Sequence, residues 1–432
     1  MQMTLQTPGT RRAAIVAEVL LFLLAAAWII KAGVADTIAK GSTVRMLKLA
    51  VRLAPLNSDY HLRLGRLYQY NIADTSPELA LIQLQRAAQL NPYDPQAWLD
   101  LAGALEFQGR IDEAETCLRF ADGLAPQLPA YQWTIGNFFL LHGNLGEAFR
   151  HFRAVLAGTS RFDGILFDTA WKAAGNAQQI IEQLIPRRTE TEFSYLNYLV
   201  GHRQEVAAQE VWKRIVQAPE SFSSAAAATY LDSLLGADHP AEAYQVWQDL
   251  LSRGIIRPSY QPTGQNLVTN SNFEENLLNM GFDWRIVPVE DVYAGLDTAT
   301  FHSPSHAIFI HFPGKTNLAY RHCYQWVRTE PRHAYRLQGM MKTEGITTDS
   351  GPRLEVRDPF DPASLDKFSE DLEGTHLGWT TLTIDFTTGP KTELIVVAIC
   401  RLPSRKLDNQ IAGKVWVDDI SLIPEKPGKV SP

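Results

Sequence analysis

The feature that most constrains the fold is a pattern of small and large apolar residues that returns at a fixed interval between positions 42 and 255. Pro92 follows a helical pattern of Ala80, Leu84 and Ala87, and 34 residues later Pro126 follows a pattern of the same kind. Small residues at such positions let two antiparallel helices approach closely, and a proline stops the second helix because it lacks a backbone N–H. The interval therefore predicts consecutive helix pairs.

The pattern recurs in neighbouring segments. Gly65 and Tyr68 mark the first unit, Gly136 and Phe139 a later one, and the unit around Trp171 is degenerate. Together these positions resemble the tetratricopeptide repeat, with roughly five or six units between 42 and 255. The resemblance implies an all-α solenoid whose concave groove holds a protein partner. Four histidines in this region show no carboxylate partner pattern in the sequence: His142, His151, His202 and His239.

The N-terminus carries an apolar run. Arg11 and Arg12 precede AAIVAEVLLFLLAAAWII, and residues 13–35 reach the length of about 20 apolar residues that spans a bilayer, with Glu18 and Lys31 included. A secretory signal peptide is the rival interpretation, because a positive segment, an apolar segment and a weak cleavage site follow one another. The sequence favours a short inside tail at 1–12, a transmembrane or signal-anchor helix at 13–35, and a body in the periplasm or outside the cell.

Composition narrows the function classes. The net charge of -7 and the pI near 5.9 argue against a general nucleic-acid-binding protein, which needs a strong basic patch. Three cysteines, Cys117, Cys323 and Cys400, are too few for a disulfide framework or a cysteine-based zinc site. Cys323 and Cys400 are either buried free thiols or, outside the cytoplasm, a disulfide pair.

The helical pattern stops near residue 256. Pro258, Pro262 and Gly264 indicate a linker over 256–264. From 265 to 424 the chain consists of short alternating segments rich in Ile, Val, Thr, Tyr and Phe, and 425–432 forms a tail. Many short strands at regular spacing predict an antiparallel β-sandwich.

Several phrases in this region occur in a recognisable order. NLVTNSNFEE and GFDW come first, Gln325 and Val327 follow, then Gly378 and Trp379, and VDDISL comes last. In this order they resemble the carbohydrate-binding modules of the galactose-binding-like jelly-roll superfamily. The resemblance implies a jelly-roll sandwich that binds a polysaccharide or glycan. The insertion DPFDPASLDKFSEDLEGTH departs from the pattern, because such modules have a short loop there.

The resemblance also implies one structural calcium ion. The first and last strands of a sandwich lie side by side, which places Glu274 near Asp418 and Asp419, and hard oxygen ligands suit Ca²⁺. The alternative is that the two aspartates end a strand and accept hydrogen bonds from nearby amides.

Strand alternation predicts which side chains face outward. One set is assigned to the core: Ile308, Ile310, Val327, Tyr335, Leu337, Leu354 and Val356. Their neighbours then form one aromatic and hydrogen-bonding set, the candidate carbohydrate site: Phe309, His311, His322, Tyr324, Trp326, Arg336, Gln338, Arg353, Glu355 and Arg357. Such a mixture suits sugars, because aromatic rings cover C–H faces while hydroxyls meet bidentate side chains. Packing of this face on the helical repeats is the alternative.

No nucleophile elbow, P-loop or metalloprotease helix is present, so an enzyme is not expected. Glu355, Asp358 and Asp361 are better explained as a solvated strand end and turn than as a glycosidase pair. The sequence thus predicts a non-catalytic envelope protein whose repeats bind a protein and whose sandwich binds a glycan. The alternatives are an assembly factor for an envelope or exopolysaccharide complex, with a sandwich that binds no sugar, and a glycan-active enzyme.

Overall fold

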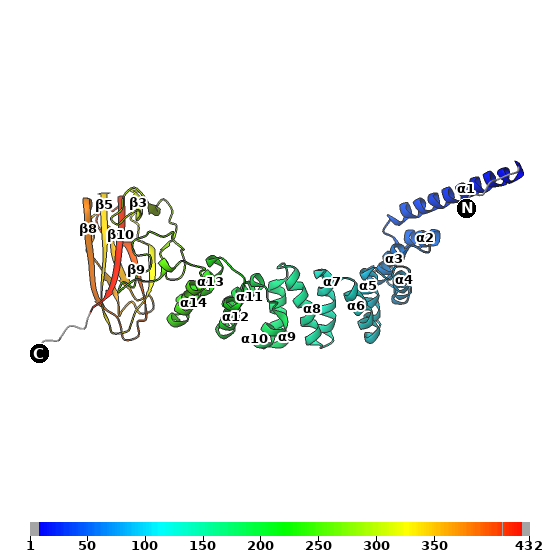
Figure 1. Ribbon diagram of the computed structural model, residues 1–432, viewed down its shortest axis with the longest axis horizontal. Helices are drawn as coiled ribbons and strands as arrows, with labels where there is room; N and C mark the ends of the chain where they lie inside the picture. Colours follow the sequence, from blue (N-terminus) through cyan, green and yellow to red (C-terminus); the bar gives the residue numbers. More distant parts are fainter. Residues whose placement is uncertain (1–7, 408, 426–432) are drawn as a thin grey trace. The chain divides into compact units, whose positions relative to one another are not determined.

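A computed structural model describes residues 8–407 and 409–425 as a series of helices followed along the chain by two antiparallel β-sheets (Figure 1). The chain forms two compact units, Met1–Thr191 and Glu192–Pro432. The boundary falls inside the predicted repeat region, because the last helices pack on the sandwich and belong to its unit. Parts of the predicted tails, residues 1–7 and 426–432, lie outside the described residues.

The first helix is longer than the predicted span. Helix α1 (Pro8–Ala39) has an exposed apolar surface, and its C-terminal end packs on α2 (Val44–Leu53), where Ala35 and Ala39 join a small core with Leu47. The Tyr60 hydroxyl also donates to Asp36 at 2.7 Å. The segment Arg11–Ala39 is long and apolar enough to cross a membrane, and a signal sequence would meet the same test.

Six helix pairs follow α2 along the chain. Their members are α3 (Ser58–Tyr70), α4 (Pro77–Leu90), α5 (Pro95–Phe107), α6 (Ile111–Leu124), α7 (Pro129–Leu141), α8 (Leu145–Gly158), α9 (Asp163–Ala174), α10 (Ala177–Gln179) with the π-helix η1 (Ile180–Leu184), α11 (Thr189–Gly201), α12 (Glu205–Gln217), α13 (Ser224–Gly236) and α14 (Pro240–Ser252). Among the helix pairs in the described part of the chain, the pair of α9 and α10 alone lacks a full second helix, in agreement with the weak pattern around Trp171. The predicted helical repeats are confirmed.

Close packing within a pair depends on residues without side-chain bulk. A Cβ added at Gly65 of α3 would lie 2.6 Å from Leu84 Cγ of α4, and one at Gly136 of α7 would lie 2.5 Å from the Phe152 ring of α8. Ala114 of α6 is fully buried. These contacts explain why the sequence keeps small residues at the interval that predicted the repeats.

The sandwich consists of two five-stranded sheets, which we name after their central strands. The β9 sheet has the order β1 (Arg285–Ile286), β4 (Tyr320–Arg328), β9 (Leu394–Arg401), β6 (Arg353–Arg357) and β7 (Asp366–Phe368). The β10 sheet has the order β2 (Tyr293–Asp297), β3 (Ala307–Pro313), β10 (Ala412–Pro424), β5 (Ala334–Ile346) and β8 (Gly374–Thr387). The predicted jelly-roll-like sandwich is confirmed.

The predicted strand alternation is correct. All seven residues assigned to the core are buried in one cluster between the two sheets. Cys323 and Cys400 are buried free thiols, not a disulfide pair. Strand parity therefore settles which residues point outward, and the question becomes which outward residues lie together.

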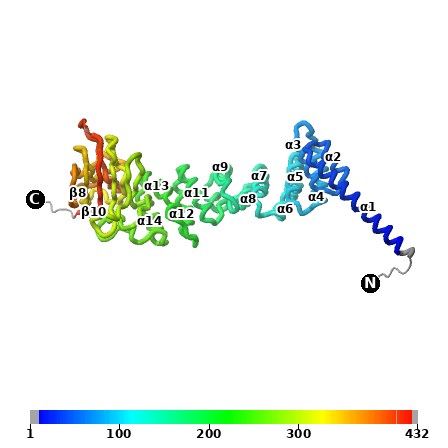
Figure 2. Tube along the Cα trace, turned by 90° about the horizontal axis from the view of Figure 1, so that it is seen from above, coloured from blue at the N-terminus to red at the C-terminus, as the bar shows by residue number. Residues whose placement is uncertain are grey.

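The predicted linker is packed rather than free. It contains the short 3-10 helix η2 (Pro258–Tyr260), and the Tyr260 hydroxyl donates to the Asn276 carbonyl at 2.5 Å. Nearby, Asp232 of α13 accepts two hydrogen bonds from Arg285 of β1, at 2.9 and 2.6 Å. Within the second unit the last helices therefore hold the edge of the sandwich directly, as their neighbouring positions in Figure 2 illustrate.

Candidate functional site

The ten predicted carbohydrate-binding residues do not share one face. Phe309 and His311 lie on β3 and Arg336 and Gln338 on β5, all in the β10 sheet. The other six lie on the β9 sheet: His322, Tyr324, Trp326, Arg353, Glu355 and Arg357. Each sheet turns its outward residues away from the core, so the two groups face opposite sides of the sandwich. The prediction of one continuous set is wrong, because parity gives direction but not sheet membership.

The β10-sheet group is largely engaged within its own sheet. Arg336 makes a bidentate contact with Asp385, at 2.7 and 3.0 Å, and an ion pair with Glu425 at 3.0 Å. Gln338 donates to Thr383 Oγ1 at 3.2 Å. These side chains are therefore explained as cross-strand pairs on a solvated surface.

The six β9-sheet residues lie together, and we call their surface the aromatic–arginine face. Tyr324 of β4, Ala398 of β9 and Glu355 of β6 form one cross-strand row, and Trp326, Val396 and Arg357 form the next. The residues of the middle strand in these two rows, Ala398 and Val396, have short side chains and are almost fully buried. Half-buried aromatic rings therefore stand on one side of a shallow central strand, and arginines stand on the other.

Glu355 is the most unusual residue on this face. Its side chain is fully buried, its carboxylate lies 3.0 Å from Arg321 Nε and 3.9 Å from Arg357 Nε, and neither oxygen accepts an aligned hydrogen bond. Burial raises the pKa of Glu355, and the two arginines oppose that shift. Glu355 is therefore a buried charge that lies between two arginines of the same sheet surface.

The interpretation of Glu355 and Asp358 as solvated residues is wrong. Asp358 is also buried, and it accepts hydrogen bonds from Thr392 Oγ1 at 2.6 Å and from the amides of Phe360 and Asp361 at 2.8 and 2.9 Å. Asp361 is exposed, as predicted. The aspartate thus organises the inserted loop, which also brings Phe360 to 6.0 Å from the Trp326 ring.

The sequence prediction missed an aromatic row on the opposite sheet. Trp416 of β10 lies 5.3 Å from the Phe309 ring, which lies 5.8 Å from the Tyr293 ring, and Lys342 Nζ lies 5.7 Å from the Trp416 ring. The signal was present in VWVDDISL, since Val415 and Val417 are core residues and the residue between them points outward. Trp416 is only 7% exposed, however, and its Nε1 donates to Asp297 at 2.7 Å, so it is mainly packed.

The predicted calcium ligands are held by protein donors. Asp418 is buried and accepts hydrogen bonds from the amides of His302, Ser303 and Asp419, at 2.7, 2.9 and 2.7 Å. Asp419 pairs with the His302 ring at 2.5 Å, and Glu274 accepts from the His306 amide at 3.2 Å. Within 8–407 and 409–425, no group of three or more His, Cys, Asp or Glu side chains is arranged to hold a metal ion. The donor set fits the strand-end alternative better than a calcium cage.

The helical repeats of the first unit carry a separate candidate site. A hollow of about 550 Å³ lies along α5 and α7, and its lining includes Tyr70, Glu106, Trp133, Asn137 and Leu141. Tyr70 and Leu141 are among the exposed large apolar residues of the chain. Aromatic and apolar side chains mixed with a few polar groups suit a bound protein segment.

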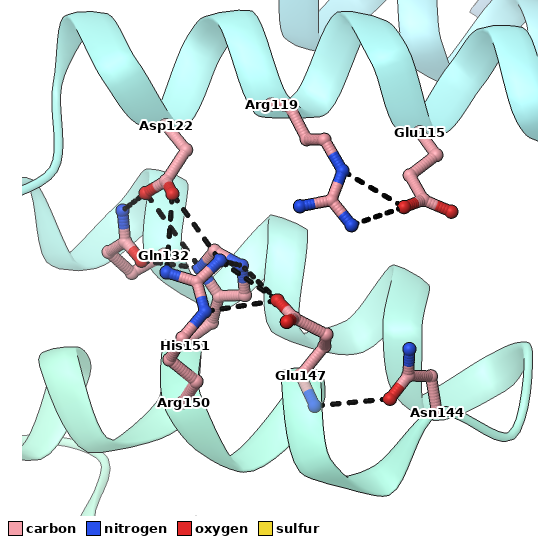
Figure 3. Close-up of polar contacts among 8 residues, drawn as sticks. All are labelled: Glu115, Arg119, Asp122, Gln132, Asn144, Glu147, Arg150 and His151. Carbon is pink, nitrogen blue, oxygen red and sulfur yellow. Dashed lines mark hydrogen bonds and ion pairs between the residues drawn. The ribbon is translucent and has the colours of Figure 1, made fainter.

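A separate polar network in the same unit links α6, α7 and α8 (Figure 3). His151 of α8 is buried, with Nδ1 2.6 Å from Gln132 Oε1 and Nε2 2.8 Å from Arg150, and Gln132 donates to Asp122 at 2.7 Å. Arg150 also pairs with Glu147 at 2.9 Å. Burial, assisted by Arg150, lowers the pKa of His151 to about 4.

The sequence shows no carboxylate partner pattern for the four repeat histidines, yet the structure places carboxylates beside three of them. His142 lies 2.8 Å from Glu106, His239 3.4 Å from Glu205, and His151 3.9 Å from both Asp122 and Glu147. The partners are far away in sequence except for Glu147, so no local pattern signalled them. The contact between His151 and Glu147 lies within α8, and the other contacts join different helices.

The chain carries helical repeats of the tetratricopeptide type, followed along the chain by a β-sandwich of two antiparallel sheets. Residues 72–132 match the family model described as tetratricopeptide repeat. No curated protein sequence matches the chain.

Solved structures resemble parts of the chain. The carbohydrate-binding and catalytic modules of Clostridium thermocellum endo-1,4-beta-D-xylanase 10B, complexed with xylohexaose, match with 14% identity and a TM-score of 0.27, over 39% of this chain and 30% of that one. The bacteriophage CBA120 tailspike protein 4 domain matches with 14% identity and a TM-score of 0.28, over 37% of this chain and 22% of that one. MamA from AMB-1 matches with 26% identity and a TM-score of 0.24, over 28% and 67%. The chain thus spans less than a third of the length of the first two structures.

Proposed function

We propose that this protein is a non-catalytic adaptor of the cell envelope, in which the repeats bind a protein partner and the aromatic–arginine face binds a glycan. The observation that carries the glycan part is the pairing of half-buried Tyr324 and Trp326 on β4 with Arg353, Glu355 and Arg357 on β6, across the short side chains of β9. Aromatic rings suit the C–H faces of sugars, and charged side chains form strong hydrogen bonds to hydroxyls.

The contacts of the two buried carboxylates support the non-catalytic part of this proposal. Glycoside hydrolysis needs two carboxylates about 5 to 9.5 Å apart that are free to exchange protons and contact water. Glu355 is held between Arg321 and Arg357, while Asp358 is occupied by Thr392 and loop amides. These contacts favour a structural role for both carboxylates over hydrolysis.

The test is a comparison of aromatic residues on the two sheets, in the full chain purified in mild detergent. Tyr324→Ala should weaken glycan binding about tenfold, since an aromatic contact contributes roughly 1 kcal/mol or more. Phe309→Ala is the matched control on the β10 sheet and should leave binding unchanged. Binding is measured by calorimetry on the best glycans from a broad panel, and the reverse pattern would move the site to the β10 sheet.

Trp326→Ala sharpens the same test. With Trp326 as a ligand contact, the variant loses about tenfold in affinity and keeps its melting temperature. With Trp326 as a packing residue, the variant loses about 3 to 5 kcal/mol of stability instead. Calorimetry and thermal melting on the same sample separate the two outcomes.

The assembly-factor alternative rests on the contact between Asp232 and Arg285, which uses the edge of the sandwich as a structural support for the helices. It takes precedence if the wild-type protein binds no member of the glycan panel, with or without Ca²⁺. The protein-binding role of the repeats is common to both proposals.

A photo-crosslinking residue at Asn137, which lines the hollow, should capture the partner of the repeats, whereas one at the exposed Arg119 on α6 should not. Capture at both positions, or at neither, would argue against this hollow as the docking groove.

We also propose that α1 anchors the protein in a membrane, with the body on the outer side. The support is the length and composition of Arg11–Ala39 and the arginine pair that precedes its apolar part. A reporter that functions only outside the cytoplasm should be active when it is fused after Pro432. Carbonate washing should leave the protein in the membrane fraction. Activity of a cytoplasm-only reporter would contradict this orientation.

A further inference from the structure

A cavity of about 570 Å³ lies between α14 and the end of the sandwich, within the second unit. Tyr244 and Trp247 of α14 form one wall, and Phe282, Trp326 and Tyr335 contribute from the sandwich side. Its volume falls in the range of about 300–1,000 Å³ typical of small-molecule sites, and its aromatic lining with a few polar groups is typical of them as well.

The walls of this cavity are held rigidly. Gly281 has a positive φ of 56°, and a Cβ there would lie 2.5 Å from Leu231 and 2.7 Å from the Trp247 ring, so the loop before β1 is pressed against the helices. Phe282 contacts the rings of both Tyr244 and Trp247, at 6.0 and 5.9 Å. Such a preformed site loses little conformational freedom when a ligand binds.

One polar group in the lining has no partner. Thr329 is 6% exposed, and its Oγ1 is buried without a hydrogen bond, although its backbone amide donates to Glu393 at 2.9 Å. A buried hydroxyl without a partner is unfavourable, so its presence in the lining of a cavity points to a ligand that hydrogen-bonds there.

The cavity is continuous with the aromatic–arginine face through a shared residue. Trp326 belongs to that face and also lines the cavity. Beyond Trp326, Arg328 ends β4 with its guanidinium 5.1 Å from the Tyr244 ring of α14. A chain that lies along the face therefore meets the wall of α14 at this end.

We propose that the cavity binds the terminal sugar unit of a glycan chain whose following units lie on the aromatic–arginine face, so that the protein recognises chain ends. This inference rests on the proposed glycan-binding function. The Thr329 hydroxyl hydrogen-bonds the terminal sugar, and Tyr244 and Trp326 cover its apolar surfaces. Helix α14 blocks the aromatic–arginine face at this end, so a glycan chain cannot continue beyond the cavity.

The experiment measures affinity and stoichiometry with the full chain in mild detergent. The probes are a xylan, a mixed-linkage β-glucan and an alginate, each with its own hexasaccharide. An end-binding protein saturates at a fixed number of molecules per chain whatever the chain length, whereas binding to internal units saturates in proportion to length.

Thr329→Val keeps the side-chain shape and removes the hydroxyl. It should weaken binding of the hexasaccharide two- to tenfold, which is the change in affinity expected from the loss of one hydrogen bond between neutral groups. It should also raise the melting temperature of the ligand-free protein, because the variant no longer buries a hydroxyl without a hydrogen-bond partner. Thr343→Val is the matched control, because Thr343 on β5 is fully buried, its Oγ1 also has no partner, and it does not line the cavity.

Each outcome decides between the proposals. Fixed stoichiometry per chain, with weaker binding by Thr329→Val and not by Thr343→Val, supports chain-end recognition. Stoichiometry proportional to chain length, or equal effects of the two valine variants, overturns chain-end recognition. If Tyr324→Ala still weakens binding in that case, the proposed glycan-binding face is retained. Absence of binding by the wild-type protein to all three polymers and their hexasaccharides overturns both.

Discussion

The helical repeats and the sandwich differ in how far apart in sequence their contacting residues are. In the repeats, Gly65 packs on Leu84 of the next helix, and His151 meets Gln132 at a separation of 19 positions. In the sandwich, Arg401 bonds Asn317 at a separation of 84 positions, and the rows of the aromatic–arginine face join three strands that are not consecutive. Local contacts leave a periodic trace in the sequence and distant pairings do not, so the repeats are readable in detail and the sandwich only in outline.

The largest effect should come from the buried arginine that joins distant parts of the sandwich. Arg401 is fully buried and donates to Ser350 O, Asn317 Oδ1, Leu318 O and Asn409 O, at 2.7 to 3.1 Å. Arg401→Leu leaves several buried acceptors without donors, at about 1–3 kcal/mol each, so we expect a loss of about 3–5 kcal/mol in denaturant unfolding.

Arg336→Leu is the control for that prediction. Arg336 is exposed and paired with Asp385 and Glu425 at the surface, so its replacement should cost less than about 1 kcal/mol. Equal losses for the two variants would show that distant buried contacts carry no special weight in the sandwich.

The corresponding test in the repeats uses overpacking at a local contact. Ala114 of α6 is fully buried, and Ala114→Trp should cost about 1–3 kcal/mol or more. Ala157→Trp, at an exposed position near the end of α8, should have little effect. An unchanged helical melting transition for Ala114→Trp would show that the assigned register is wrong.

The pH dependence of the repeats should follow His151. Its pKa is about 4 in the folded protein and near 6.5 in the unfolded chain, so below pH 6.5 the unfolded chain takes up the proton first. Stability should therefore fall as the pH falls from about 7 to 4, by on the order of 3 kcal/mol, and this contribution should be constant above about pH 7.5.

His151→Gln should remove that part of the pH dependence when helical unfolding is followed across this range. His142→Gln, at a more exposed histidine of the same repeats, should retain it. If the two variants and the wild type lose stability in parallel, His151 is not the responsible group.

The smallest effect is expected for calcium. Both oxygens of Asp418 already accept amide hydrogen bonds, so millimolar Ca²⁺ or a chelator should shift the melting temperature by no more than about 1 °C. A bound ion at 100 times its Kd would instead add about 2.7 kcal/mol. A clear stabilisation that is lost in Asp418→Asn would restore the calcium site that the family resemblance implies.

Much of the fold was predictable because it depends on short-range patterns. The interval between Pro92 and Pro126 predicted helix pairs, and the alternation around Val327 and Leu337 predicted the core face of the strands. Both patterns express one physical rule, that apolar side chains recur with the period of the element that buries them. Even Trp416, which was missed, could be assigned an outward direction from its two valine neighbours.

What the sequence alone does not contain is the order of the strands and the packing of the last helices. Parity sends both Phe309 and Tyr324 outward, and only the sheet order places them on opposite sides and brings Tyr324 into a row with Glu355. The cavity beside Trp326 exists because Gly281 allows the loop before β1 to approach Trp247 of α14. Pairings between distant segments depend on the free energy of the whole packed unit, so the tertiary structure decided which predicted side chains share a site.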